Sequence, residues 1–213
     1  MWNSSTGPDA HDLVLEALRE ISAARILEVG SGKGELAERI SSELCADVIA
    51  VDQSERMVEL TREWGVHAAL GDVQDLPFED ESFDACVAAW MLYHVPDLDR
   101  GLRELARVTR PGGRLVAVTN SERSLTELWT LVGEPWKTNY PFGAENGGAA
   151  LARHFDRVEH VDVAGTITFS SFEDARRYIA SSPTRAHLAG YLPDFDGPLV
   201  ATRAVAVFVA EKV

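Results

Sequence analysis

The chain has 213 residues, 46% hydrophobic and 25% charged, which is typical of one globular domain with an elaboration and excludes a disordered or fibrous protein. Its 20 basic and 34 acidic residues give a formal net charge of −14, which disfavours nucleic acid and anionic membranes as partners. We find no signal-peptide pattern and no run of about 18 apolar residues, so we expect a cytoplasmic protein without a membrane span. The two cysteines, Cys45 and Cys86, are expected to be buried thiols rather than a disulfide.

Up to residue 119, short apolar runs alternate with amphipathic patterns. A helix over 9–22 is followed by a pattern in which each strand precedes a helix, except that the strand at 66–70 leads into an acidic loop. The expected strands cover 25–30, 47–52, 66–70, 83–89 and 114–119, and the expected helices follow Gly34, Ser54 and Asp97. Strands of this length alternating with helices indicate βαβ units on a parallel sheet. The continuous apolar character of the strands indicates that both faces of this sheet are covered.

After residue 120 the alternation stops. Residues 121–132 are compatible with a helix, whereas 133–148 is rich in glycine and proline and is interpreted as a loop or lid. Its aromatic residues either build an apolar acceptor pocket or pack inside the lid; they are Trp136, Tyr140 and Phe142. Two later strands are expected at 158–163 and 202–209, with a helix at 172–181 between them.

The most informative segment is the glycine-rich turn at 30–34, between the first strand and the following helix. Glycines allow a sharp turn and a close approach of the backbone to a ligand. A dinucleotide-binding loop would require glycine where Glu35 stands, and Glu28 is unfavourable beside a pyrophosphate, so a nicotinamide oxidoreductase is disfavoured. Asp52 and Asp72 end the next two strands. Together with Glu28 they place three carboxylates in the crevice where open α/β sheets bind ligands. This charge suits a neutral or cationic nucleoside.

In this order, the motifs resemble the class I S-adenosylmethionine-dependent methyltransferases, and most closely the type 11 methyltransferase domain. The resemblance covers about residues 26–119. The matching segments are Ile26–Gly34, Val51–Ser54, Gly71–Phe78, Phe83–Asp84, Leu92–Val95 and Leu105–Gly113. The family fold is a Rossmann-like, doubly wound, seven-stranded, mostly parallel α/β sheet with an antiparallel last strand. The resemblance therefore implies S-adenosyl-L-methionine as cofactor and S-adenosyl-L-homocysteine as product.

The resemblance also implies a place for each part of the cofactor. The methionyl part would enter beside the loop glycines, with Glu28 near its ammonium group and its sulfonium beside Ala88 and Ala89. Asp52 would bind the ribose hydroxyls and Met57 would pack near the adenine. The predicted cofactor-binding residues are Glu28, Gly30, Ser31, Gly32, Gly34, Asp52, Gln53, Met57, Asp72, Val73, Ala88 and Ala89. Among these, Asp72 would accept from the adenine amino group and the Val73 backbone would meet the ring edge.

His94 follows the fourth strand, where a methyl acceptor would lie, and is the candidate catalytic residue. It would serve either as a general base or as a residue that orients the loop by hydrogen bonds. No histidine spacing indicates a metal site. We expect methyl transfer to a small organic acceptor by a monomer or homodimer, with the acceptor atom open. The alternative is a non-catalytic module that binds S-adenosylmethionine.

The expected organisation is a single domain, residues 1–213. It comprises an N-terminal helix or cap (1–24), the cofactor-binding core (25–120), substrate-side insertions (121–155 and 165–197) and the last strands (156–163 and 202–210).

Overall fold

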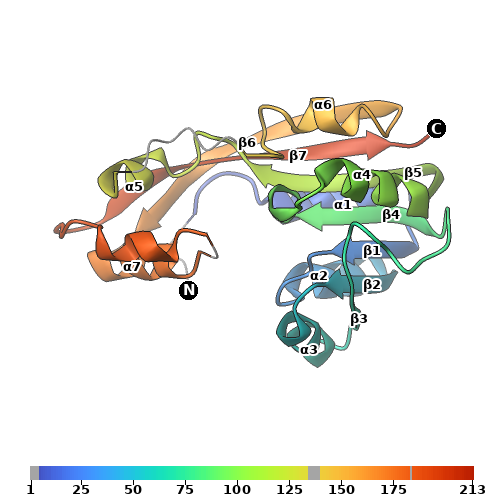
Figure 1. The fold of residues 1–213 in the computed structure, drawn as a ribbon, viewed down its shortest axis with the longest axis horizontal. Coiled ribbons are helices and arrows are strands. Elements are labelled where there is room, and N and C mark those ends of the chain that lie inside the picture. The colour runs from blue at the N-terminus through green and yellow to red at the C-terminus, as the bar shows by residue number, and fades with distance from the viewer. Residues whose placement is uncertain (1–4, 134–139, 183) are drawn as a thin grey trace.

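The computed structural model describes residues 5–133, 140–182 and 184–213 (Figure 1). The first half of the chain builds the expected alternation of strands and helices. Its elements are α1 (Ala10–Glu20), β1 (Arg25–Val29), α2 (Glu35–Leu44), β2 (Asp47–Asp52), α3 (Glu55–Glu63), β3 (His67–Leu70), β4 (Phe83–Ala89), η1 (Leu92–His94), α4 (Leu98–Val108) and β5 (Thr109–Asn120). The second half adds α5 (Thr126–Leu131), α6 (Gly147–Leu151), β6 (Arg157–Phe169), α7 (Phe172–Ala180), η2 (Ala186–Gly190) and β7 (Leu199–Glu211).

One seven-stranded sheet runs in the order β3-β2-β1-β4-β5-β7-β6. Strands β1 to β5 are parallel to one another, whereas β7 pairs antiparallel with both β5 and β6. The predicted fold class, a mostly parallel sheet with an antiparallel last strand, is confirmed. The order reverses between β1 and β4, and ligands of open α/β sheets bind at the carboxyl ends of the strands at such a point.

Helices cover both faces of the sheet, as the apolar strands predict. One core cluster joins α1 and α2 to the sheet through side chains such as Leu18 and Ile40. The opposite cluster joins α4 and α6 through Leu102, Leu105 and Leu151. Helix α1 therefore belongs to the core, and none of its residues lines either of the two cavities described below.

Strands β6 and β7 contain 13 residues each and are longer than the predicted 158–163 and 202–209. Their extension reaches beyond the rest of the sheet and carries α5 and α7 at one end of the molecule (Figure 1). A third hydrophobic cluster, which includes Trp129, Phe169 and Ile179, packs these elements together. Segments predicted as substrate-side insertions therefore have a small core of their own, attached to the sheet through two continuous strands.

The segment predicted as a lid is partly core. Phe142 is fully buried, and its ring centroid lies 5.7 Å from that of Phe208, so it does not face an acceptor. Residues 147–151 form α6, which packs on the sheet. Trp136 lies outside the described residues. Cys86 is buried as expected, but Cys45 is exposed, because it ends α2 in a left-handed conformation (φ 53°) at the surface.

Candidate donor and acceptor sites

A cleft of about 370 Å³ opens at the carboxyl ends of β1, β2 and β4. It is lined by six of the predicted site residues, which are Gly30, Gly32, Asp52, Gln53, Val73 and His94. We call this cleft the donor cleft. Sequence positions far apart are brought together here because parallel strands end at the same edge of the sheet.

The loop glycines have three different surroundings. All have positive φ, between 54° and 84°, which favours glycine. A Cβ on Gly32 would meet nothing within 4 Å, so this residue leaves open space for a ligand. A Cβ on Gly30 would lie 2.6 Å from Met91 Cβ, and one on Gly34 2.8 Å from Thr61 Cα. Gly34 therefore permits contact between the loop and α3 and does not make room for the methionyl part, contrary to expectation.

Glu28 is buried beneath this loop and is 2% exposed. Burial, with a contribution from the charge of Asp52, raises the pKa of its carboxyl to about 8, although the backbone N–H of Ala37 donates to it. Its Oε2 atom has no hydrogen-bond partner among the described residues. A buried polar atom without a partner is costly, and an ammonium group of a ligand would satisfy it.

Asp52 ends β2 and is held by the backbone. Its Oδ2 accepts from Gly32 N–H (2.9 Å) and its Oδ1 accepts from Ser54 N–H (2.9 Å). Each carboxylate oxygen can accept more than one hydrogen bond, so the group keeps capacity for two ligand hydroxyls. The same contacts show why sequence alone leaves a structural role open: Asp52 also fixes the glycine loop.

Asp72 lies between Gly71 and Val73, both of which line the donor cleft. Its Oδ1 accepts from the Gln74 backbone N–H (2.9 Å), and both its oxygens accept from the Gln74 side chain. Partial burial raises the pKa of Asp72, but the hydrogen bonds from Gln74 and Gln53 outweigh burial and hold it below its ordinary value. Asp72 is thus an ionised acceptor whose orientation is fixed.

Four other predicted residues do not line the donor cleft. Ser31 is buried, with its hydroxyl 3.3 Å from that of Thr61. Ala88 is fully buried in the core and does not line the cleft. Met57 and Ala89 are half-buried and are not among the residues that line the cleft.

Trp90 and Met91 line the donor cleft after β4, although neither was predicted as a cofactor-binding residue. Trp90 has φ 55°, a conformation that costs free energy for a residue with a side chain, and its backbone N–H donates to Val118 O (2.8 Å). Met91 packs against Gly30. A glycine would be the usual signal for such a backbone, and this chain has tryptophan there.

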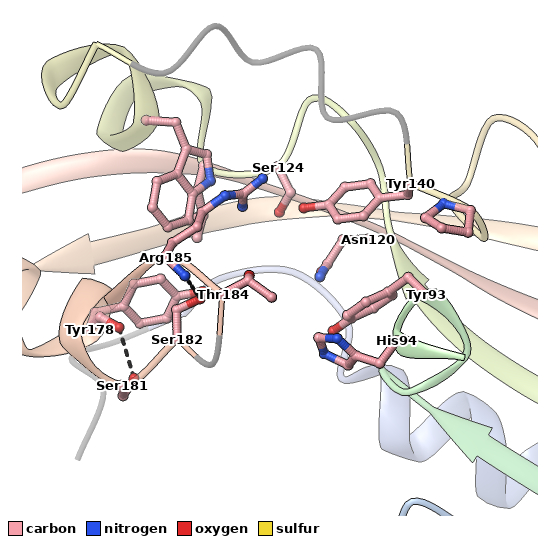
Figure 2. Close-up of a pocket in the computed structure, with 13 residues that line it drawn as sticks. Tyr93, His94, Asn120, Ser124, Tyr140, Tyr178, Ser181, Ser182, Thr184 and Arg185 are labelled. Atoms are coloured by element: carbon pink, nitrogen blue, oxygen red, sulfur yellow. Dashed lines mark hydrogen bonds between the residues drawn. The ribbon is translucent and has the colours of Figure 1, made fainter. Parts of the chain in front are cut away.

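A second cavity, of about 410 Å³, lies between the end of the sheet and the elements carried by β6 and β7. We call it the acceptor cavity. Figure 2 shows Tyr93, His94, Asn120 and Tyr140 on one side of it, and Tyr178, Ser182 and Arg185 on the other. Of its lining residues, Tyr140 was predicted as a possible part of an acceptor pocket and His94 as the candidate catalytic residue. Burial, with a smaller effect of Tyr140, raises the pKa of the Tyr178 phenol to about 12, so this group is neutral at pH 7.

His94 lines both the donor cleft and the acceptor cavity. It ends the short helix η1, and its ring packs edge-on against Tyr93 with centroids 4.5 Å apart. Desolvation holds the pKa of its imidazole below the ordinary value, so the ring is neutral at pH 7. No hydrogen bond joins the ring to any residue that the structure describes, so these residues give no support for the loop-orienting alternative.

Among residues 5–133, 140–182 and 184–213, His, Cys, Asp and Glu side chains form no group of three or more suited to a metal ion. None of the helices in this part of the chain combines the length and apolar character needed to span a membrane.

The sequence is similar to those of known methyltransferases. The methyltransferase domain family matches residues 27–117. The chain is 30% identical over 190 residues to the methyltransferase GfsG of Streptomyces halstedii, covering 80% of this chain and 68% of that protein. It is 37% identical over 125 residues to the malonyl-[acyl-carrier protein] O-methyltransferase of Erwinia pyrifoliae, covering 56% of this chain and 47% of that enzyme.

Two solved structures share the fold. The YcgJ protein of Bacillus subtilis has a TM-score of 0.68 at 17% identity, with 95% of this chain and 98% of that chain covered. The [4+2]-cyclase SpnF has a TM-score of 0.63 at 22% identity, with coverage of 95% and 80%. Because one of these proteins is described as a cyclase, the fold by itself does not define the reaction.

The chain belongs to the methyltransferase domain family, whose members are S-adenosylmethionine-dependent enzymes. S-Adenosylmethionine is accordingly its cofactor. The donor cleft fits this molecule in three respects: open space at Gly32, a buried carboxylate oxygen on Glu28 without a partner, and oriented acceptors on Asp52 and Asp72.

Proposed function

We propose that this protein transfers a methyl group from S-adenosylmethionine to a small organic acceptor bound in the acceptor cavity. The observation that carries the proposal is the position of His94, which lines both cavities. The modest volume of the acceptor cavity and the acidic chain both favour a small molecule over a nucleic acid.

In the proposed site, Asp52 binds the ribose hydroxyls, while Asp72 and the Val73 backbone bind the adenine. Glu28 becomes the carboxylate partner of the ammonium group, and Gly30 and Gly32 admit the methionyl part. When bound, S-adenosylmethionine supplies an activated methyl group on a sulfonium. The chain's own task is to orient the acceptor in line and to exclude water.

We further propose that His94 accepts the proton of the acceptor's nucleophilic group. The ring is neutral at pH 7, faces the acceptor cavity and has no hydrogen bond to a described residue that would occupy its nitrogens. Neighbouring Tyr93, whose pKa is raised mainly by burial, stays protonated and acts as a hydrogen-bond donor.

The test is a screen of small phenols, amines, carboxylic acids and quinone-like compounds with S-adenosylmethionine labelled on its methyl group. Label should appear in an organic product, and Asp52→Asn should greatly reduce it at low donor concentration. Asp47→Asn is the matched control, because Asp47 is exposed at the opposite end of the same strand. Thermal stabilisation by the donor without label transfer to any acceptor would instead support a non-catalytic donor-binding module.

A further inference from the structure

Arg185 is the one residue with a permanent charge among the described residues that line the acceptor cavity. The other lining side chains there are aromatic, aliphatic, amide or hydroxyl groups, together with His94. The chain as a whole carries 34 acidic residues against 20 basic ones. A cavity without a carboxylate in its described wall, but with a guanidinium, is therefore unusual for this protein.

The structure shows no ion pair between Arg185 and another described residue. Most arginines here are neutralised: Arg114, for example, pairs with Glu20 and Glu211 at 2.8 and 2.9 Å. The Arg185 guanidinium instead lies over the ring of Trp129, 4.5 Å from its centroid. Stacking leaves the N–H groups in the guanidinium plane available for a planar anion.

The position of Arg185 is fixed by local structure. Its backbone N–H donates to Ser182 Oγ at 3.2 Å, directly before η2. Trp129 beneath it is only 6% exposed and belongs to the hydrophobic cluster of the extension. The side chain is thus held in one place, which lowers the entropic cost of binding a ligand.

Arg185 and His94 lie on opposite sides of the acceptor cavity (Figure 2). A group bound by Arg185 is consequently at the far end of the acceptor from the donor cleft. A cationic acceptor is disfavoured, although aromatic rings surround the cavity, because the face of Trp129 is already occupied by a cation.

We propose that the acceptor carries an acidic group, a carboxylate or a phosphate, that binds Arg185 while a different atom of the acceptor lies at His94 for methylation. The inference rests on the proposed function and specifies its substrate class. The Tyr178 phenol, which is protonated at pH 7, lies on the same side of the cavity as Arg185 and adds no negative charge beside the bound acid.

The experiment measures binding by fluorine NMR to protein saturated with S-adenosylhomocysteine. The probes are para-fluorobenzoate, para-fluorophenyl phosphate, the neutral para-fluorobenzamide and the cationic para-fluorobenzylamine. The variants are Arg185→Met, Arg185→Lys and, as matched control, Arg176→Met, which removes an exposed arginine that pairs with Glu173 on α7. Saturation by S-adenosylhomocysteine is verified first by calorimetry for every variant.

At least one anion should bind the wild type more tightly than the amide and the amine. Arg185→Met should weaken the binding of that anion by about 10-fold to 100-fold, as expected for the loss of a charge-assisted hydrogen bond. Arg185→Lys should retain part of the affinity. Arg176→Met should leave it unchanged. Comparison of the benzoate with the phosphate ester identifies which acid is preferred.

The inference is overturned if neither anion binds, if both bind Arg185→Met as tightly as the wild type, or if the amine binds best. Failure of S-adenosylhomocysteine to bind would overturn the proposed function itself, so the two failures are distinguishable.

Discussion

Replacing Glu28 by Gln tests whether the buried carboxyl beneath the glycine loop is protonated in the free protein. The unfolded chain releases this proton near pH 4.5, whereas the folded protein releases it near pH 8. Between these values the folded state binds more protons, so its stability falls as pH rises, by about 1.4 kcal/mol per pH unit. From pH 5 to pH 8 the wild type should lose roughly 3.5 kcal/mol relative to Glu28→Gln, which does not titrate.

The assay is urea unfolding of both proteins at several pH values, with Glu16→Gln, an exposed glutamate on α1, as control. The stability difference between wild type and Glu28→Gln should grow with pH, and the control should show no such trend. Calorimetry should also show proton release when S-adenosylmethionine binds at pH 7, because its ammonium group favours the carboxylate. Parallel stability curves for Glu28→Gln and the wild type would refute the assignment of a raised pKa.

Three further predictions concern the cavities. Asp52→Ala should weaken S-adenosylhomocysteine binding by about 2–3 kcal/mol in calorimetry, and an unchanged dissociation constant would remove Asp52 from the donor cleft. Gly32→Val should abolish donor binding, whereas the control Gly112→Val should not. Both glycines have positive φ and open surroundings, but only Gly32 lines the donor cleft. Equal effects of the two substitutions would indicate backbone strain as the cause. His94→Ala should lower turnover about 10²–10⁴-fold with donor affinity preserved. In the wild type, the rate should fall in acid as His94 becomes protonated, with a pKa below the ordinary 6.5. If His94→Ala lowers turnover less than tenfold and leaves the pH profile unchanged, His94 is not the general base.

The sheet and most of the donor cleft are predictable from sequence because local signals agree there. Apolar strands, the glycine turn and acidic residues at strand ends each specify the same edge of the sheet. The individual roles of the glycines were not predictable, since they depend on which atoms approach from elsewhere: Thr61 for Gly34 and Met91 for Gly30. The choice between the two roles predicted for Phe142 was open for the same reason, because its packing depends on Phe208 of β7.

For the acceptor cavity, the sequence indicates which segments contribute but not which of their residues meet. Its walls come from η1, the end of β5, α5, α7 and the turn before η2, which meet because β6 and β7 extend beyond the sheet. A sequence pattern can indicate that 202–209 is a strand, but the length of the pairing between β6 and β7 is a tertiary property. Arg185 therefore carried no local signal of a role in binding.

A crystal structure with S-adenosylhomocysteine and a bound aromatic carboxylate would test both cavities at once. We predict the ribose at Asp52, the methionyl carbon chain at Gly32 and the carboxylate at Arg185. The sulfur should point toward His94, which lines both the donor cleft and the acceptor cavity. S-Adenosylhomocysteine bound away from Asp52 and Gly32, or its sulfur directed away from the acceptor cavity, would contradict this prediction.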